Sequence, residues 1–319
     1  MNLSVLGAGA FGTALAIALS RDGTRVTLWS RDACDAARMQ ETRRTGVRLP
    51  GHHLPDSLQV TADETAFGAA VCLVAVPTQN LASFLRDHDF GSGGAIIACC
   101  KGIDRATGLG PVATIQAARP SHTAAMMTGP SFAVDIANGL PTAIVLATER
   151  AKESRKLQAS LTRPLLRLYR STDVPGAELG GALKNVVALA AGISVGAGFG
   201  DSARASVIAR GFGELVRYAA LQGARRKTLH GLSGLGDLVL TCMSEKSRNF
   251  SAGVALGRGV DIDRETTVEG LATAPVVAES AAAAGLDLPV MKATADVIEG
   301  RLDISRAVEA LLSRPVGKE

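Results

Sequence analysis

The chain has 319 residues, of which 47% are hydrophobic, 20% charged and 3% aromatic, and its formal net charge is +4. These values are typical of a globular protein long enough for two domains, and they exclude a disordered or fibrous chain. No aromatic-bearing basic face is visible, so the small positive charge also argues against a nucleic-acid partner.

The first predicted element is a strand at residues 3–6, which runs directly into a glycine-rich loop. Gly7, Gly9 and Gly12 form the pattern G-x-G-x-x-G, and an apolar helical segment follows at 13–19. In this context the glycines permit a tight turn, close approach of a pyrophosphate and close packing of helix on strand. The helix N-terminus would face the phosphates of a dinucleotide. A glycine-rich corner without a ligand is the alternative.

The second strand is predicted at 25–29 and is followed by Ser30, Arg31 and Asp32. A protein specific for NAD usually places a carboxylate directly at this strand end to bind the ribose hydroxyls. The Arg31 guanidinium can instead pair with a 2′-phosphate. We therefore expect NADP (NADPH) to be preferred with NAD also possible, although Asp32 lies close by and Arg31 is alternatively an exposed loop residue.

Further β-rich runs alternate with helical patterns through the first half of the chain. This alternation predicts an α/β fold with a parallel, doubly wound, Rossmann-like sheet, and ligands collect at the carboxyl ends of such strands. The predicted strands are 71–76, 95–100, 124–128 and 142–147.

From about residue 174 the β signal fades and apolar residues recur with a period near 3.6, which predicts an all-helical second half. Because aromatic residues are scarce, we expect these helices to approach one another closely. Pro and Gly within 170–176 indicate the link, so the expected domains are a dinucleotide-binding domain at 1–172 and a substrate-binding domain at 173–319. The predicted helices are 178–195, 203–223, 272–284, 290–299 and 304–312.

One charged residue, Lys184, lies among apolar and small residues in the first of these helices. Burial disfavours an ammonium group, which would bring the pKa of the amine toward the range useful for proton transfer. The alternative is a lysine whose stem packs while its charged end reaches water.

Polar groups also gather at 234–249, beside an apolar helical run. Asp237 taken alone is explained by capping of a helix N-terminus. Ser247, Arg248 and Asn249 are explained in the same way, with Ser247 as the cap. A helix N-terminus that carries these three residues is equally a good phosphate receptor.

The motifs together resemble one family. In chain order they are G-A-G-A-F-G-T-A-L-A, C-K-G, G-P-S-F-A, L-K-N-V, G-L-G-D-L-V-L-T-C and S-R-N. This set closely resembles the bacterial-type NAD(P)-dependent glycerol-3-phosphate dehydrogenases, and the similarity spans nearly the whole chain. Several motifs in the right order are far more specific than any one of them.

The resemblance implies a role for individual residues. It makes Lys184 the catalytic proton acceptor, oriented by Asp237 and Asn185. Ala10 departs from the Ser or Thr common in the family, which removes one hydroxyl contact to the pyrophosphate. The implied substrate contacts are Lys101, Gly129, Ser131, Lys184, Asp237, Ser247, Arg248 and Asn249. The implied cofactor contacts, with the three loop glycines Gly7, Gly9 and Gly12, are Ala10, Phe11, Arg31, Lys101, Ala133, Arg248, Val268 and Glu269.

The implied function is an oxidoreductase that interconverts sn-glycerol 3-phosphate and dihydroxyacetone phosphate by hydride transfer with NAD(P)(H). Its partner is a small phosphorylated substrate, and its product supplies the glycerol phosphate backbone of phospholipids. Two alternatives remain at this point. One is a related dehydrogenase of a 3-hydroxy acid or sugar acid, and the other is a non-catalytic NADP-binding redox sensor.

The remaining sequence features concern location and assembly. Five cysteines form an odd set without C-x-x-C or Cys/His metal spacing, so we expect a reduced, cytoplasmic protein without a metal site. The chain opens on a strand and phosphate loop, and no apolar run reaches about 18 residues without a polar or charged interruption, so we expect no signal peptide and no membrane insertion. A homodimer is one assembly that the sequence permits.

Overall fold

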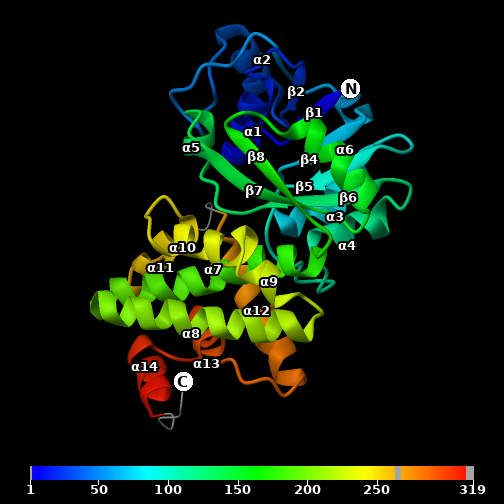
Figure 1. Ribbon diagram of the computed structural model, residues 1–319. Helices are drawn as coiled ribbons and strands as arrows, with labels where there is room; N and C mark the ends of the chain where they lie inside the picture. The colour runs from blue at the N-terminus through cyan, green and yellow to red at the C-terminus, as the bar shows by residue number, and fades with distance from the viewer. Residues whose placement is uncertain (1, 263–266, 314–319) are drawn as a thin grey trace.

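The computed structural model describes residues 2–262 and 267–313, which form an α/β domain followed by a helical domain (Figure 1). The α/β domain is built on one eight-stranded sheet with the order β3-β2-β1-β4-β5-β6-β7-β8. The predicted Rossmann-like, doubly wound fold is confirmed. The strands are β1 (Leu3–Leu6), β2 (Val26–Trp29), β3 (Leu58–Thr61), β4 (Val71–Val74), β5 (Ala95–Ala98), β6 (Thr123–Thr128), β7 (Thr142–Ala147) and β8 (Leu166–Ser171).

The sheet differs from the prediction in two respects. Strands β3 and β8 were not predicted, and both lie at edges of the sheet. Strand β7 runs antiparallel to β6, with Met126 opposite Ala147, so the sheet is mostly rather than wholly parallel. The connecting helices are α1 (Ala10–Ser20), α2 (Ala33–Thr42), the 3-10 turn η1 (Glu64–Gly68), α3 (Thr78–Asp87), α4 (Pro111–Ala118), α5 (Ala133–Ala137) and α6 (Ala151–Leu161).

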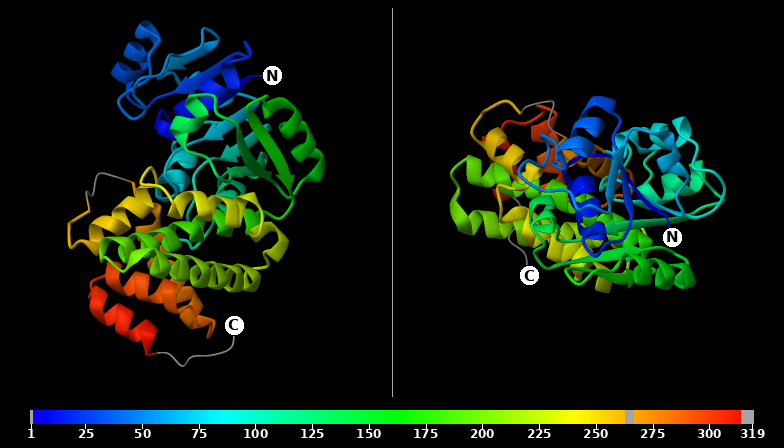
Figure 2. Two further views of the ribbon diagram at one scale, coloured as in Figure 1. Left: turned by 60° about the vertical axis from the view of Figure 1, so that its left-hand side comes forward. Right: turned by 90° about the horizontal axis from the view of Figure 1, so that it is seen from above.

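The helical domain is organised around α7 (Val174–Gly196), which is capped at its start by the Asp173 carboxylate accepting from the Gly176 amide at 3.1 Å. The helices within residues 200–298 pack around α7. Figures 1 and 2 show the last helix, α14 (Ile304–Leu312), at the end of this domain farthest from the sheet. The other elements are α8 (Gly200–Leu221), α9 (Arg226–Leu229), the π-helical turn η2 (Leu232–Gly236), α10 (Asp237–Cys242), α11 (Arg248–Gly257), α12 (Glu269–Ala283), α13 (Pro289–Ile298) and α14 (Ile304–Leu312).

Helix α7 is also long and apolar enough to cross a membrane, alone among the helices of the described residues. However, 78% of its apolar window is buried inside the protein. A helix that is hydrophobic all round and covered by other helices is typical of the core of a large domain. We therefore interpret α7 as the core helix of the second domain.

Two glycine pairs bring α7 and α11 into contact along their backbones. A Cβ on Gly253 would lie 2.9 Å from the Cα of Gly192, and a Cβ on Gly257 would lie 2.8 Å from the Cα of Gly196. Side chains larger than hydrogen would push the helices apart at these points. The expected close approach of helices is confirmed here, and it fixes where α11 begins relative to α7.

Candidate active site

The candidate site lies where α7 meets the carboxyl ends of β5 and β6. Helix α7 packs against β6, β7 and α4 of the first domain and against α10 of the second. Lys101 follows β5, Gly129 follows β6, Lys184 lies in the middle of α7 and Asp237 opens α10. The fold therefore brings together four predicted substrate-binding residues that lie far apart in the sequence.

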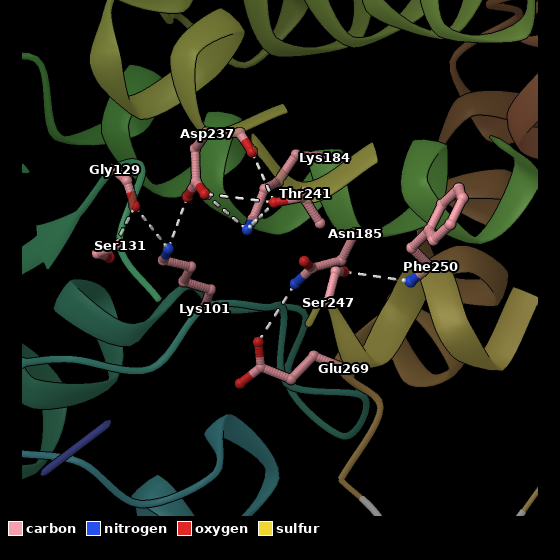
Figure 3. Close-up of polar contacts among 10 residues, drawn as sticks. All are labelled: Lys101, Gly129, Ser131, Lys184, Asn185, Asp237, Thr241, Ser247, Phe250 and Glu269. Carbon is pink, nitrogen blue, oxygen red and sulfur yellow. Dashed lines mark hydrogen bonds and ion pairs between the residues drawn. The ribbon is translucent and has the colours of Figure 1, made fainter. Parts of the chain in front are cut away.

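Asp237 is the centre of this cluster, and its side chain is only 2% exposed. One carboxylate oxygen accepts from Lys101 Nζ at 2.6 Å and the other from Lys184 Nζ at 2.8 Å (Figure 3). Asp237 is the first residue of α10 and not its N-cap, which is Gly236. The capping interpretation of Asp237 is therefore wrong, because both of its oxygens are paired with lysines.

Thr241 holds Lys184 from the other side. Its Oγ1 accepts from Lys184 Nζ at 2.6 Å and donates to the Asp237 carbonyl oxygen at 2.6 Å, one helical turn back. The sequence argument did not single out this residue, although its spacing of four from Asp237 places both on one face of a helix. Asn185 was expected to orient Lys184, and instead its Nδ2 donates to Glu269 Oε2 at 3.2 Å.

Burial and the neighbouring charges set the protonation of the pair. Burial lowers the pKa of Lys184 to about 8, even though the Asp237 carboxylate favours the ammonium form. Burial alone would raise the pKa of Asp237, but the Lys101 and Lys184 ammonium groups outweigh it and hold that pKa below its usual range. The alternative of a lysine reaching bulk water is wrong, because the Lys184 side chain is 8% exposed and ends on Asp237.

The loop after β6 positions Lys101. The Gly129 carbonyl oxygen accepts from Lys101 Nζ at 3.1 Å and from Ser131 Oγ at 2.9 Å. Gly129 has φ +138°, and a Cβ there would lie 3.1 Å from Ile144 Cα on β7. Glycine is required at this position because the conformation is rarely open to other residues and the space is occupied by backbone.

The second polar group of the site opens α11. Ser247 caps the helix, with its Oγ accepting from the Phe250 amide at 3.2 Å, so the capping expectation for this residue is confirmed. The Asn249 side-chain oxygen accepts from the Gly270 amide at 2.8 Å, which joins α11 to the start of α12. Arg248 is exposed beside them. These three residues combine a helix N-terminus, a hydroxyl and an exposed guanidinium, which is a combination suited to an anion.

The glycine-rich loop fits a dinucleotide. Gly7 has φ +117°, and a Cβ on Gly12 would lie 3.0 Å from the Ala75 Cβ, so both positions require glycine. A Cβ on Gly9 would meet no atom within 4 Å, which leaves open space in front of the N-terminus of α1. Backbone amides at that N-terminus can receive a pyrophosphate.

Comparison with known proteins places this arrangement in a family. The profile of the NAD-dependent glycerol-3-phosphate dehydrogenase N-terminus matches residues 2–154, and that of the C-terminus matches residues 173–309. The chain belongs to the NAD-dependent glycerol-3-phosphate dehydrogenase family. It is 51% identical over 321 residues to glycerol-3-phosphate dehydrogenase (NAD(P)+) of Ruegeria sp., with 100% of each chain covered. It is also 33% identical to the glycerol-3-phosphate dehydrogenase of Coxiella burnetii, whose crystal structure superposes with a TM-score of 0.90 over 98% of this chain and 99% of that one.

In this member of the glycerol-3-phosphate dehydrogenase family, the residues predicted to select the cofactor, Arg31 and Asp32, follow the end of β2. Arg31 is exposed, whereas the Asp32 carboxylate caps α2 by accepting from the Asp35 amide at 3.0 Å. Because Asp32 is used for capping, it is a weaker competitor for the ribose than its place in the sequence suggested. The enzyme is NAD(P)-dependent, in agreement with the names of its relatives.

The remaining predicted cofactor contacts lie at the starts of three helices of this family fold. Ala10 and Phe11 form the first turn of α1, and Ala133 opens α5. Val268 precedes α12 and Glu269 opens it. Burial raises the pKa of Glu269, while the positive charge of Arg248 opposes that rise. Their contact with the cofactor stays a prediction.

Proposed function

We propose that the protein interconverts sn-glycerol 3-phosphate and dihydroxyacetone phosphate, with Lys184 as the group that moves the proton. The observation that carries the proposal is the pair of lysines on the buried Asp237 carboxylate, at the junction of a dinucleotide-binding domain and a helical domain. A bound nicotinamide supplies or accepts the hydride. The protein positions the substrate and controls its proton.

Lys184 has a different task in each direction of the reaction. In oxidation its neutral amine removes the proton of the secondary hydroxyl. In reduction its ammonium donates a hydrogen bond to the ketone oxygen and then returns the proton. Asp237 and Thr241 fix the Nζ in place from two sides. Proton transfer by a positioned group of this kind contributes about a hundredfold to ten thousandfold in rate.

Positive charge and helix amides account for the choice of a phosphorylated substrate. Lys101 reaches the Asp237 carboxylate from the sheet, and we expect Arg248 and the N-terminus of α11 to meet the phosphate from the helical domain. A phosphate dianion gains both charge pairing and hydrogen bonds there. A hydroxy acid offers only a carboxylate and would use fewer of these groups.

Further parts of the proposal concern cofactor preference, cellular role, domain division and assembly. We infer that NADPH is preferred over NADH, that the enzyme supplies the glycerol phosphate backbone of phospholipids, and that it works in the cytoplasm. We place the domain division between residues 172 and 173, just before the Asp173 cap of α7. Light scattering on the purified protein would distinguish a homodimer from a monomer.

One assay tests the function. Dihydroxyacetone phosphate should be reduced with consumption of NADPH over many turnovers, whereas 3-oxo acids and keto sugar acids at equal concentration should be reduced far more slowly. The Lys184→Ala variant should still bind NADPH but lose turnover. Preference for a carboxylate substrate would support the related dehydrogenase instead. NADPH binding by the wild type without turnover of any of these substrates would support a redox sensor.

A further inference from the structure

A polar contact joins the two domains at the surface, beside the candidate active site. Lys246 lies in the turn between α10 and α11 of the helical domain, and Phe132 and Asp135 lie at the start of α5 in the α/β domain. Lys246 Nζ is 3.1 Å from an Asp135 carboxylate oxygen and 5.8 Å from the centre of the Phe132 ring. A cation at that distance from an aromatic face is attracted to it.

The partners of this contact are sequence neighbours of the predicted substrate-binding residues. Lys246 directly precedes Ser247, the cap of α11, and Phe132 directly follows Ser131, which donates to the Gly129 carbonyl oxygen. The contact therefore ties the loop after β6 to the N-terminus of α11. Other contacts between the domains are made by α7, which packs on β6, β7 and α4, and by η2, which packs on β7.

We propose that Lys246 is a positioning residue that holds these two segments at a fixed separation across the substrate site. The inference rests on the proposed function, since it assigns Lys246 to binding of the phosphorylated substrate. Within the described residues Lys246 pairs with Asp135, whereas the Asp237 cluster is made by other side chains, so Lys246 acts on binding geometry and not on proton transfer. Its side chain is 56% exposed and that of Asp135 is 28% exposed, so the contact contributes only a small part of the binding free energy.

The first experiment is a kinetic comparison of Lys246→Ala with the wild type. An exposed ion pair of this kind corresponds to about a two- to fivefold change in an equilibrium constant. We expect the KM for dihydroxyacetone phosphate to rise by about that factor while kcat stays near the wild-type value. The matched control is Lys156→Ala, which removes a pair with Glu153 at the same 3.1 Å but within the single helix α6. The control should leave KM unchanged.

Two further variants separate positioning from simple attraction of an anionic substrate by Lys246. Asp135→Asn removes a negative charge from the entrance, so attraction alone predicts a lower KM, whereas loss of the interdomain contact predicts a higher one. The exchanged pair, Lys246→Asp with Asp135→Lys, should recover most of the lost affinity. A lower KM in Asp135→Asn, or an exchanged pair no better than the single variants, would overturn the proposal.

A measurement without substrate keeps this inference separate from the proposed function. The thermal midpoints of the wild type, the two single variants and the exchanged pair form a cycle in which coupling between positions 135 and 246 is expected. Failure of the wild type to reduce dihydroxyacetone phosphate would remove the proposed function but leave that coupling intact. Absence of coupling in an active enzyme would remove the positioning role alone.

Discussion

Lys184 and Lys101 share a single carboxylate, and this sharing determines how easily Lys184 releases its proton. Each lysine contacts a different oxygen of Asp237, so the two ammonium groups lie close together in a buried place. Burial and the positive charge of Lys101 both lower the pKa of Lys184, and Asp237 opposes them. The result is a pKa of about 8, near the working pH of a general acid or base.

This pKa predicts opposite pH profiles for the two directions of reaction. Reduction requires the ammonium form, so kcat/KM for dihydroxyacetone phosphate should be highest below pH 8 and fall as pH rises through about 8. Oxidation requires the free amine, so kcat/KM for glycerol 3-phosphate should rise through the same pH. Initial rates measured in both directions across this range check the prediction.

The matched variant for that profile is Asp237→Asn. Without the negative charge of Asp237 the ammonium form of Lys184 is less favoured, so the pKa of Lys184 falls. The pH at which kcat/KM changes should therefore move to a lower value, whatever happens to the absolute rate. If the pH of this change stayed the same or rose, a group other than Lys184 would be responsible for the profile.

Arg31 gives a second prediction at the scale of a residue. It is exposed at the end of β2, where it can pair with a 2′-phosphate, while Asp32 caps α2. Arg31→Ala should weaken NADPH binding by about tenfold or more, as expected for loss of a charge-assisted bidentate contact, and should change NADH binding little. Fluorescence titration with both cofactors measures this, and equal losses would show that Arg31 does not select between them.

The sequence predicted the participants of the site better than their contacts. Asp237 was expected to orient Lys184, and it does contact the lysine. The pairing of Lys101 with the same carboxylate was not predicted, because it depends on how the two domains meet, which no local pattern specifies. The role of Thr241 could have been predicted, because it lies four residues after Asp237 and therefore on the same face of the helix. The link from Asn185 to Glu269 was not, since it joins residues 84 apart in the sequence.

At the scale of elements, the packing of α11 on α7 sets where the anion-binding N-terminus of α11 lies. The helices touch through backbone at Gly192 and Gly253, so an added methyl group has no free space. Gly253→Ala should destabilise the protein by about 1–3 kcal/mol through overpacking. It should also raise the KM for dihydroxyacetone phosphate, because Arg248 and Asn249 move with the helix. Urea unfolding and steady-state kinetics measure the two effects.

The matched control is Gly213→Ala in α8. A Cβ there would lie 3.6 Å from the nearest atom, an ordinary contact with the end of the Arg217 side chain. This variant should be stabilised by about 0.5–1 kcal/mol, because alanine restricts the unfolded chain and favours the helix. If Gly253→Ala were equally stabilised, close packing of α7 on α11 would be disproved.

The sheet shows which kinds of strand a sequence pattern does not predict. Inner strands such as β1, β4 and β5 are buried at every position, so their apolar runs were recognised. The edge strands β3 and β8 alternate buried and exposed residues over few positions, which gives a weaker signal. The reversed direction of β7 was also missed, because a pattern of apolar residues carries no information about strand direction.

At the scale of the whole molecule, the candidate active site lies at the junction of the two domains. The first domain provides the glycine-rich loop and Lys101, and the second provides Lys184, Asp237 and the start of α11. A hydride donor held by one domain can then meet a substrate held by both. The two-domain organisation was predictable because the change from β-rich to helical periodicity near residue 174 is sharp.

The most direct test of this account is a crystal structure of the protein with the oxidised cofactor and glycerol 3-phosphate. We predict Lys184 Nζ within hydrogen-bonding distance of the oxygen on the reacting carbon, about 2.6–3.2 Å, with that carbon facing the nicotinamide. The phosphate should lie at the N-terminus of α11. A ternary complex in which Lys184 remains bound to Asp237 and Thr241 but distant from that oxygen would contradict the account.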